Sequence, residues 1–346
     1  MQTIDAPVNQ NITSSDLPSD KTNSAAKTSV ASDICPSLAS LLKAAGDEFR
    51  LQVLKVLNRD SYGVLELCTI FSIKQSALSH HLKVLANAGL VTTRREGNSI
   101  FYRRAHTICP QELLSLQQSI LSSSNLLTLT PNIQQGITAV QQERSSNSQQ
   151  FFSDNADKFK AHQDLIAGLE QYGPAVEELC HALTTFNKAV EIGPGEGDFL
   201  VTLSKLFKQI IAIDNSESML AKSQTLITDK AINNVSFALG DTAFAATQNL
   251  QADCVIANMV LHHTPNPAAI FQDLAKCLTT GGSLIICDLL SHDQSWTREN
   301  CGDVWLGFDE HELTTWAQAA NLRSTQETYL TLRNGFRIQV RQFLKH

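Results

Sequence analysis

Hydrophobic and polar positions divide the 346-residue chain into segments with different patterns. Residues 1–33 are rich in Ser, Thr, Asn and Asp, so ordering them would cost conformational entropy that burial does not offset. Apolar residues recur at helical spacing in 34–121, thin out in the Ser/Gln/Asn-rich stretch 122–150, and form short apolar runs between helical patterns in 151–346. The pattern predicts a disordered tail, a first domain, a linker with a connecting helix, and a second domain.

The first domain combines helical patterns with a hairpin. The predicted elements are helices before a turn at 61–63, helices at 64–71 and 75–88, and strands at 90–95 and 99–104. Gly89 is placed to end the helix before the hairpin. This order predicts an α+β winged helix-turn-helix domain.

The second domain alternates strands and helices. The predicted strands are 188–192, 209–214, 235–239, 252–258 and 283–289, with helical patterns between most of them and a last helix at 309–320. Such alternation predicts an α/β, Rossmann-like fold with a mostly parallel sheet covered on both faces. Ligands of such sheets bind at the carboxyl ends of the strands.

Charge is distributed unevenly between the two domains. The whole chain carries a formal charge of −7, whereas residues 35–104 contain ten Lys and Arg against five Asp and Glu. A basic N-terminal domain favours nucleic acid as its partner. The eight cysteines form no Cys-x-x-Cys pair, which favours a cytoplasmic location, and no apolar run has the roughly 18 residues that a membrane span requires.

A glycine-rich loop follows the first strand of the second domain. Gly193, Gly195 and Gly197 allow a tight turn and a close approach to a ligand before the next helix begins. Acidic or amide side chains end the next three strands at Asp214, Asp241 and Asn258. A dinucleotide-binding loop is the alternative interpretation, but its G-x-G-x-x-G pattern places the third glycine one residue later.

Together these motifs resemble the class I S-adenosylmethionine-dependent methyltransferases over roughly residues 150–346. The resemblance implies that S-adenosylmethionine or S-adenosylhomocysteine is bound by Glu191, Gly193, Gly195, Gly197, Asp214, Asp241 and Asn258. Asp214 would accept hydrogen bonds from the ribose, and Asp241 would meet the adenine.

Residues for methyl-transfer chemistry are sparse. The chain has no Asn/Asp-Pro-Pro-Tyr/Phe segment, and Asn258-Met259-Val260-Leu261 occupies that place. His262 and His263 are candidates for a general base, or they simply belong to the loop after the fourth strand. The sequence therefore leaves enzymatic activity open.

The first domain resembles the ArsR/SmtB family of winged-helix repressors. The resemblance rests on residues 66–71, 74–85 and 89–91. It implies DNA contacts from Lys74, Gln75, Ser76, Ser79, His80 and Lys83 on the recognition helix and from Arg94, Arg95, Arg103 and Arg104 on the wing. A solvated basic wing is the alternative interpretation for the four arginines.

No metal is expected to bind this chain. Relatives that sense arsenite use a Cys-x-Cys pair, whereas this chain has Cys68 but Ile70 at the partner position. His80 and His81 are adjacent on the predicted helix, so they do not share one face.

Two functions remain in competition. The first is a repressor whose methyltransferase-like domain senses S-adenosylhomocysteine or S-adenosylmethionine, and the second is an active methyltransferase of a small-molecule acceptor that carries a DNA-binding domain. Residues 302–308 and 332–340 resemble segments of ArsR-type regulators that respond to S-adenosylhomocysteine and control methionine-cycle genes. This resemblance favours the sensor. The ArsR/SmtB resemblance implies a homodimer on a palindromic DNA operator. Trp305 and Phe308 either cap the ligand pocket or pack the last helix on the sheet.

Overall fold

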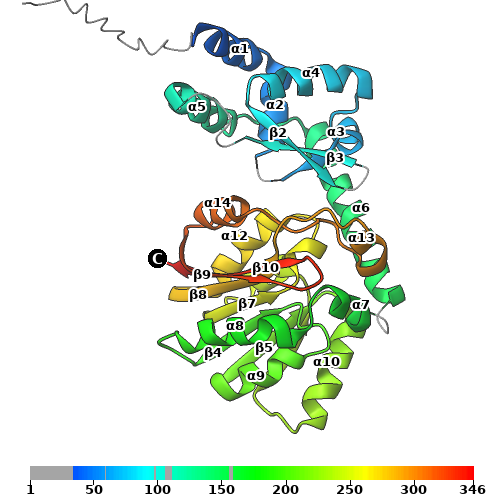
Figure 1. Cartoon of the computed structure of the whole chain (residues 1–346), viewed down its shortest axis with the longest axis vertical. Coiled ribbons are helices and arrows are strands. Elements are labelled where there is room, and N and C mark those ends of the chain that lie inside the picture. The colour runs from blue at the N-terminus through cyan, green and yellow to red at the C-terminus, as the bar shows by residue number, and fades with distance from the viewer. Residues whose placement is uncertain (1–33, 59, 97–98, 106–110, 156–158) are drawn as a thin grey trace, which may run out of the picture.

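A computed structural model describes residues 34–58, 60–96, 99–105, 111–155 and 159–346. The predicted tail at 1–33 lies outside these residues. Figure 1 shows the N-terminal elements above the second domain, with one long helix running between them. Among the described helices, none has the length and apolar character that crossing a bilayer requires.

The N-terminal elements form the predicted winged helix-turn-helix domain. They are α1 (Cys35–Ala45), α2 (Glu48–Val56), β1 (Tyr62–Gly63), α3 (Val64–Phe71), α4 (Gln75–Asn87), β2 (Val91–Glu96), β3 (Ser99–Arg104), η1 (Gln111–Leu113) and α5 (Leu114–Ser124). The three strands pair antiparallel in the order β1-β3-β2. Leu78, Leu82 and Leu85 of α4 are fully buried, which fixes this helix on the core of the domain.

Helix α6 (Pro131–Asn155) connects the two domains and packs on the helix-turn-helix. Gly136 of α6 lies so close to α3 that a Cβ atom there would come within 2.7 Å of the Ile70 backbone. The glycine therefore permits direct backbone packing. The predicted connecting segment thus contains a long helix that belongs to the structure of both domains.

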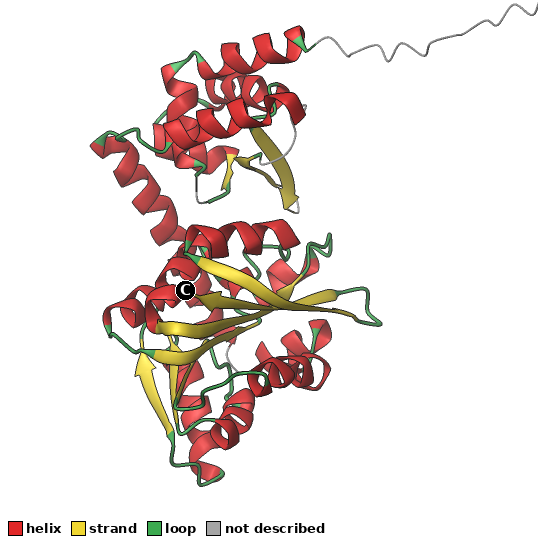
Figure 2. Ribbon diagram, turned by 90° about the vertical axis from the view of Figure 1, so that its left-hand side faces the viewer, coloured by secondary structure: helices red, strands yellow, loops and turns green. Residues whose placement is uncertain are grey.

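The second domain has a seven-stranded sheet in the order β6-β5-β4-β7-β8-β10-β9. Its elements after α7 (Phe159–Ile166) are α8 (Leu169–His181), β4 (Lys188–Ile192), α9 (Asp198–Leu206), β5 (Gln209–Asp214), α10 (Glu217–Asp229), β6 (Val235–Leu239), α11 (Thr242–Thr247), β7 (Ala252–Asn258), η2 (Leu261–His263), α12 (Pro267–Cys277), β8 (Leu278–Leu289), α13 (Trp296–Cys301), α14 (Glu310–Ala319), β9 (Leu322–Thr331) and β10 (Arg337–Lys345). The five strands from β4 to β8 are parallel, and helices cover both faces of the sheet (Figure 2).

The predicted α/β fold is confirmed, with one addition. Strands β9 and β10 form an antiparallel hairpin that extends the sheet beyond β8 and was not predicted. Two apolar clusters lie on opposite sides of the sheet and form the core. Because the chain crosses from β4 to β5 in one direction and later to β7 in the other, the carboxyl ends of β4 and β7 form a topological switch point, where ligands bind in such folds.

Candidate functional site

The glycine loop turns sharply between β4 and α9. Gly193, Gly195 and Gly197 have φ angles of +61°, +59° and +92°, which residues with side chains rarely adopt. A Cβ atom on Gly193 would lie 2.7 Å from a methyl group of Val260, and one on Gly197 would lie 3.1 Å from Ser223 Cα. Conformation and crowding together explain why glycine occupies these positions.

A cavity of about 500 Å³ opens beside this loop at the carboxyl ends of the strands. Six of the seven residues predicted to hold an S-adenosyl ligand line it: Glu191, Gly193, Gly195, Asp214, Asp241 and Asn258. Gly197 stands behind the loop as the N-cap of α9 and does not line the cavity. Residues up to 67 positions apart are therefore brought together around one cavity.

The carboxyl groups of Glu191, Asp214 and Asp241 border this cavity in different surroundings. Glu191 is 2% exposed, and burial raises its pKa to about 8, although Asn258 Nδ2 donates to Oε1 at 3.4 Å. Burial also raises the pKa of Asp214 to about 6, although its carboxylate accepts a hydrogen bond from Ser216 N at 2.8 Å. Asp241 accepts from Phe244 N at 2.8 Å and so caps α11. Among the described residues, Glu191 Oε2 has no hydrogen-bond partner, so it suits a ligand that brings a hydroxyl, amino or ammonium donor.

One wall of the cavity comes from the connecting helix. The helix was predicted, but its contribution to the cavity was not. Thr138, Gln141, Gln142 and Ser145 of α6 line the cavity. No motif marks these residues, because polar side chains in a Ser/Gln-rich segment carry no signal of what they face. The ligand cavity is thus built partly from the helix that packs on the DNA-binding domain.

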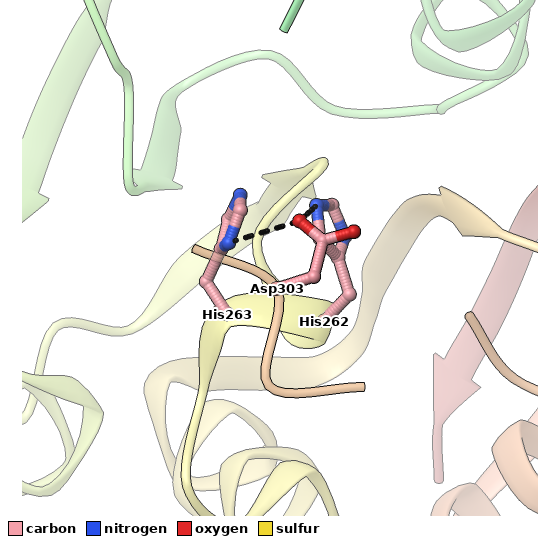
Figure 3. A group of neighbouring side chains, drawn as sticks. All are labelled: His262, His263 and Asp303. Carbon is pink, nitrogen blue, oxygen red and sulfur yellow. Dashed lines mark ion pairs between the residues drawn. The ribbon is translucent and has the colours of Figure 1, made fainter. Parts of the chain in front are cut away.

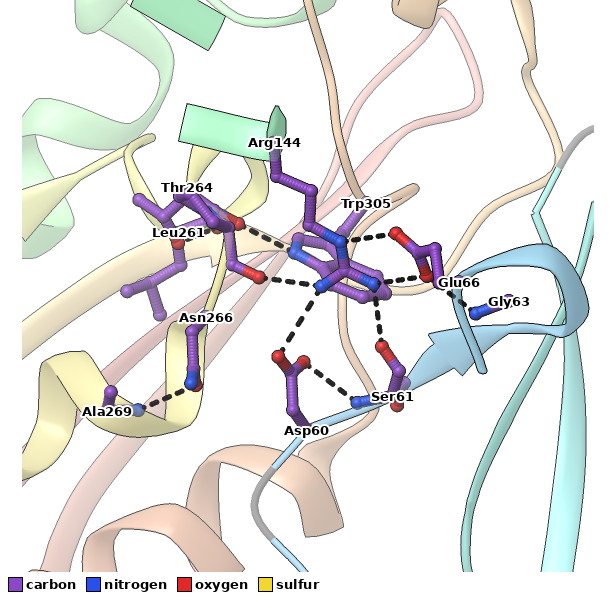
Figure 4. A network of polar contacts seen from close by, with 11 residues as sticks. Asp60, Ser61, Gly63, Glu66, Arg144, Leu261, Thr264, Asn266, Ala269 and Trp305 are labelled. Carbon is purple, nitrogen blue, oxygen red and sulfur yellow. Dashed lines mark hydrogen bonds and ion pairs between the residues drawn. The ribbon is translucent and has the colours of Figure 1, made fainter. Parts of the chain in front are cut away.

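Arg144, on the same helix, joins the two domains (Figure 4). Its guanidinium donates to both carboxylate oxygens of Glu66, at 2.6 and 2.7 Å, and to Pro265 O at 2.9 Å. It also lies 5.1 Å from the ring centres of Tyr62 and Trp305, within the range of cation–π attraction. Arg144 therefore ties the first domain to the loop that leads from β7 into α12.

Trp305 and Phe308 lie near this junction. Neither ring lines the 500 Å³ cavity; both border a second cavity of about 530 Å³ between the domains. Trp305 Nε1 donates to Thr264 O at 2.8 Å, and the Phe308 ring packs edge-on against Trp316. The predicted capping role does not fit these positions, and the packing alternative does.

The recognition helix presents its predicted polar face to solvent. The six residues named for DNA contact, Lys74, Gln75, Ser76, Ser79, His80 and Lys83, are all exposed. The buried leucines of α4 occupy the opposite face. This geometry leaves the helix available for a DNA groove.

The wing arginines are engaged within the chain. Arg94 donates to Leu306 O at 3.0 Å and to Gly307 O, and it pairs with Glu312 Oε2 at 3.3 Å. Arg103 pairs with Asp309 at 2.8 Å and with Glu312. The predicted phosphate contacts of Arg94 and Arg103 do not fit this arrangement, in which the wing is docked on α14. The side chain of Arg95 lies outside the described residues.

Arg104 was predicted to contact DNA but lies in the interior. It is 5% exposed, and it donates to Leu54 O at 2.6 Å, Leu121 O at 3.1 Å and Ser124 Oγ at 2.8 Å. Burial lowers its pKa to about 10. These contacts join α2 to α5, so the arginine stabilises the domain and does not face a phosphate.

The two candidate histidines have different surroundings. His263 lines the ligand cavity, whereas His262 does not and is 0% exposed. His262 Nδ1 lies 2.8 Å from Asp288 Oδ1. Burial lowers the pKa of His262, but the carboxylates of Asp288 and Asp303 outweigh this and raise it. Only His263 is placed to meet a second substrate, and burial lowers its pKa well below its usual value.

Family comparisons agree with this division of the chain. The model of a methyltransferase domain matches residues 138–327, and that of bacterial regulatory proteins of the arsR family matches residues 47–93. The arsenical resistance operon repressor of Staphylococcus aureus is 33% identical over 99 residues, which are 29% of this chain and 93% of the repressor. The chain joins an ArsR-family domain to a methyltransferase domain.

Other relatives match the methyltransferase domain. Trans-aconitate 2-methyltransferase of Acidovorax ebreus is 32% identical over 120 residues, 34% of this chain and 44% of that enzyme. The crystal structure of N-methyltransferase NodS from Bradyrhizobium japonicum, in complex with S-adenosylhomocysteine, is similar over 54% of this chain and 98% of NodS. Its TM-score is 0.42 and its sequence identity 16%.

Proposed function

We propose that this protein is a DNA-binding transcriptional regulator, a repressor, whose methyltransferase domain binds S-adenosylhomocysteine or S-adenosylmethionine. The observation that carries the proposal is the double role of α6. Its residues Gln141 and Ser145 line the ligand cavity, while Arg144 and Gly136 hold the helix-turn-helix. A ligand that contacts α6 therefore acts on an element that also positions the DNA-binding domain.

The cavity suits an S-adenosyl compound in each of its parts. The buried Glu191 carboxyl and the glycine loop would receive the methionine end, where the N-terminus of α9 and the loop offer N–H groups. Asp214 would accept hydrogen bonds from the ribose hydroxyls, and Asp241 would lie near the adenine. These assignments use groups that already border one space.

Ligand binding can change DNA affinity only by favouring one arrangement of the domains over another. In the docked arrangement, Arg94 and Arg103 bind acidic and carbonyl groups of the methyltransferase domain. The Asp309 and Glu312 carboxylates occupy donors of these guanidiniums and their negative charge repels a phosphate, so docking and full wing contact with DNA would compete. A ligand that contacts α6 in the docked arrangement would stabilise it and release the DNA.

DNA recognition would use α4 in a major groove, because its six polar residues are exposed together. We propose that the chain acts as a homodimer on a palindromic operator and controls methionine-cycle genes. Genome-wide binding with and without each ligand would identify those genes, and equilibrium sedimentation would measure the oligomeric state.

The test is DNA affinity as a function of ligand. An operator obtained by in vitro selection would be titrated with the full chain, with and without saturating S-adenosylhomocysteine or S-adenosylmethionine. We expect at least tenfold weaker DNA binding with one of them, and in Asp214→Ala a response that requires about 10- to 150-fold more ligand. DNA affinity that is unchanged by both ligands, when calorimetry shows that they bind, would refute the sensor.

Catalytic methyl transfer to a small acceptor is the second candidate, because His263 borders the same cavity as the residues proposed to hold the methyl donor. A labelled-methyl assay across varied small acceptors tests it. Sustained turnover that is abolished in Asp214→Ala would establish the enzyme, and DNA binding would then serve to localise or regulate it.

A further inference from the structure

Three buried side chains converge between η2 and the segment after α13 (Figure 3). His262 Nε2 lies 3.8 Å and His263 Nδ1 lies 3.6 Å from Asp303 Oδ1. Each residue offers one ligand atom, and these three atoms all lie within 4.8 Å of one another. These side chains come from places 40 residues apart in the chain and meet in the interior.

Polar atoms of His262 and Asp303 lack hydrogen bonds, whereas His263 Nδ1 lies 3.4 Å from Gly302 O, a contact that an ion on this nitrogen would replace. Among the described residues, neither His262 Nε2 nor either carboxylate oxygen of Asp303 has a hydrogen-bond partner, although both side chains are at most 1% exposed. Burial raises the pKa of Asp303 and the nearby Thr297 hydroxyl lowers it, but the hydrogen of this hydroxyl is donated to Gln294 O at 3.2 Å. Buried polar atoms without partners are costly, so a cation that these atoms could bind would stabilise the cluster.

Surrounding groups hold His262 in the orientation that metal ligands need. Its Nδ1 faces Asp288 Oδ1 at 2.8 Å, and Asp288 is itself fixed by Leu261 N and Leu289 N, both at 2.8 Å. A carboxylate on one imidazole nitrogen fixes the tautomer and leaves the other nitrogen free to bind a cation. The Val304 N–H donates to His262 O at 2.9 Å, which holds the Asp303 segment against η2.

We propose that His262, His263 and Asp303 bind one divalent transition-metal ion of the zinc class. Two imidazole nitrogens and a carboxylate oxygen are ligands that such ions accept. Ligand atoms at about 2.0–2.2 Å from a tetrahedral ion lie about 3.3–3.5 Å apart. The two distances to Asp303 Oδ1, 3.8 and 3.6 Å, would shorten by a few tenths of an ångström, and the separation of the two imidazole nitrogens, at most 4.8 Å, would shorten by side-chain rotation.

The site would be open on one side. His263 also lines the ligand cavity, so water or a molecule held in that cavity can supply the fourth ligand. Such a site is independent of the proposed sensor function, because the three side chains would bind the ion whether or not the chain binds DNA or an S-adenosyl compound.

Metal titration of the untagged, chelator-treated full chain tests the proposal. Calorimetry with Zn²⁺, and elemental analysis after dialysis, should show one ion bound per chain. Asp303→Asn keeps the size of the side chain but loses its charge, and should weaken Zn²⁺ binding at least 100-fold. The matched control is His181→Ala, because His181 is an exposed histidine on α8 and should leave the stoichiometry unchanged.

Co²⁺ gives a second measurement that does not depend on the stability of one variant. Its visible absorption reports ligand number and type, and His263→Ala should change the spectrum or abolish it. Circular dichroism would establish that each variant is folded. No bound ion in the wild type, or equal Zn²⁺ affinity in wild type, Asp303→Asn and His263→Ala, would overturn the proposal and leave His262 as an imidazolium between Asp288 and Asp303.

Discussion

Replacing Glu312 by Gln removes one negative charge from α14 while keeping the size of the side chain. The Glu312 carboxylate pairs with both Arg94 and Arg103, and it also accepts from Asp309 N at 2.8 Å in a capping box that Gln can retain. Arg94 and Glu312 are only 13% and 12% exposed, so solvent screens their ion pair weakly. The substitution therefore weakens docking of the wing without removing the start of α14.

Hydrogen bonds to charged groups contribute about 1.5–3 kcal/mol and neutral ones about 0.5–1.5 kcal/mol. Losing the charge should thus cost about 1 kcal/mol at each arginine. Docking is then weaker by about 2 kcal/mol, or about 30-fold. Because docking competes with DNA, the affinity for DNA rises by up to this factor, and we expect an increase of about 5- to 30-fold.

Fluorescence anisotropy with the selected operator would measure this change at fixed salt concentration. Glu310→Gln is the matched control, since Glu310 is exposed on the same helix and its loss removes the same net charge. Equal DNA affinities for wild type and Glu312→Gln would refute the competition between docking and DNA. An equal gain in Glu310→Gln would show that net charge alone is responsible.

Three further predictions concern ligand binding, coupling and stability. Calorimetry should show that Asp214→Ala loses about 1.5–3 kcal/mol of S-adenosyl binding free energy. The affinity of the wild type for the S-adenosyl ligand should fall as the pH drops below about 6, because the protonated Asp214 carboxyl group accepts hydrogen bonds poorly. A flat pH profile would contradict this. Arg144→Met should keep the affinity for the S-adenosyl ligand within about threefold but reduce the effect of that ligand on DNA binding. The control is Glu143→Gln, which changes an exposed neighbour and should leave the effect intact. An unchanged effect in Arg144→Met would exclude Arg144 from the coupling between ligand binding and DNA binding. Denaturant unfolding should show that Arg104→Met destabilises the ArsR-type domain by about 2–4 kcal/mol, because buried carbonyl groups lose their donor. Lys83 is exposed, so Lys83→Met should lower DNA affinity with little change in the free energy of unfolding.

Patterns along the chain predicted most of the fold. Strands β4 and β5 have the predicted bounds, because continuous apolar runs bounded by polar residues are a local signal. The hairpin of β9 and β10 was missed. One face of β9 is exposed and β10 carries the buried Arg341, so neither strand has the apolar composition of a central strand.

The candidate ligand site was also predicted in large part. The glycines mark a backbone conformation that only they adopt readily, and the residues that end parallel strands must meet at one edge of the sheet. The wall contributed by α6 was not predictable, because helical periodicity does not say which distant surface a polar side chain faces.

The sequence by itself determined the two domains, the recognition helix and the loop beside the ligand cavity, since each depends on neighbouring residues or on strand order. Only the tertiary structure decided what each basic residue contacts. Arg104 is buried, and Arg94 pairs with Glu312, 218 positions away in the sequence. The tertiary structure likewise separated His262 from the cavity and placed it beside Asp303. Arg residues look alike in a sequence, and burial and the partners reached by folding decide whether each one stabilises the core, joins domains or remains available for DNA.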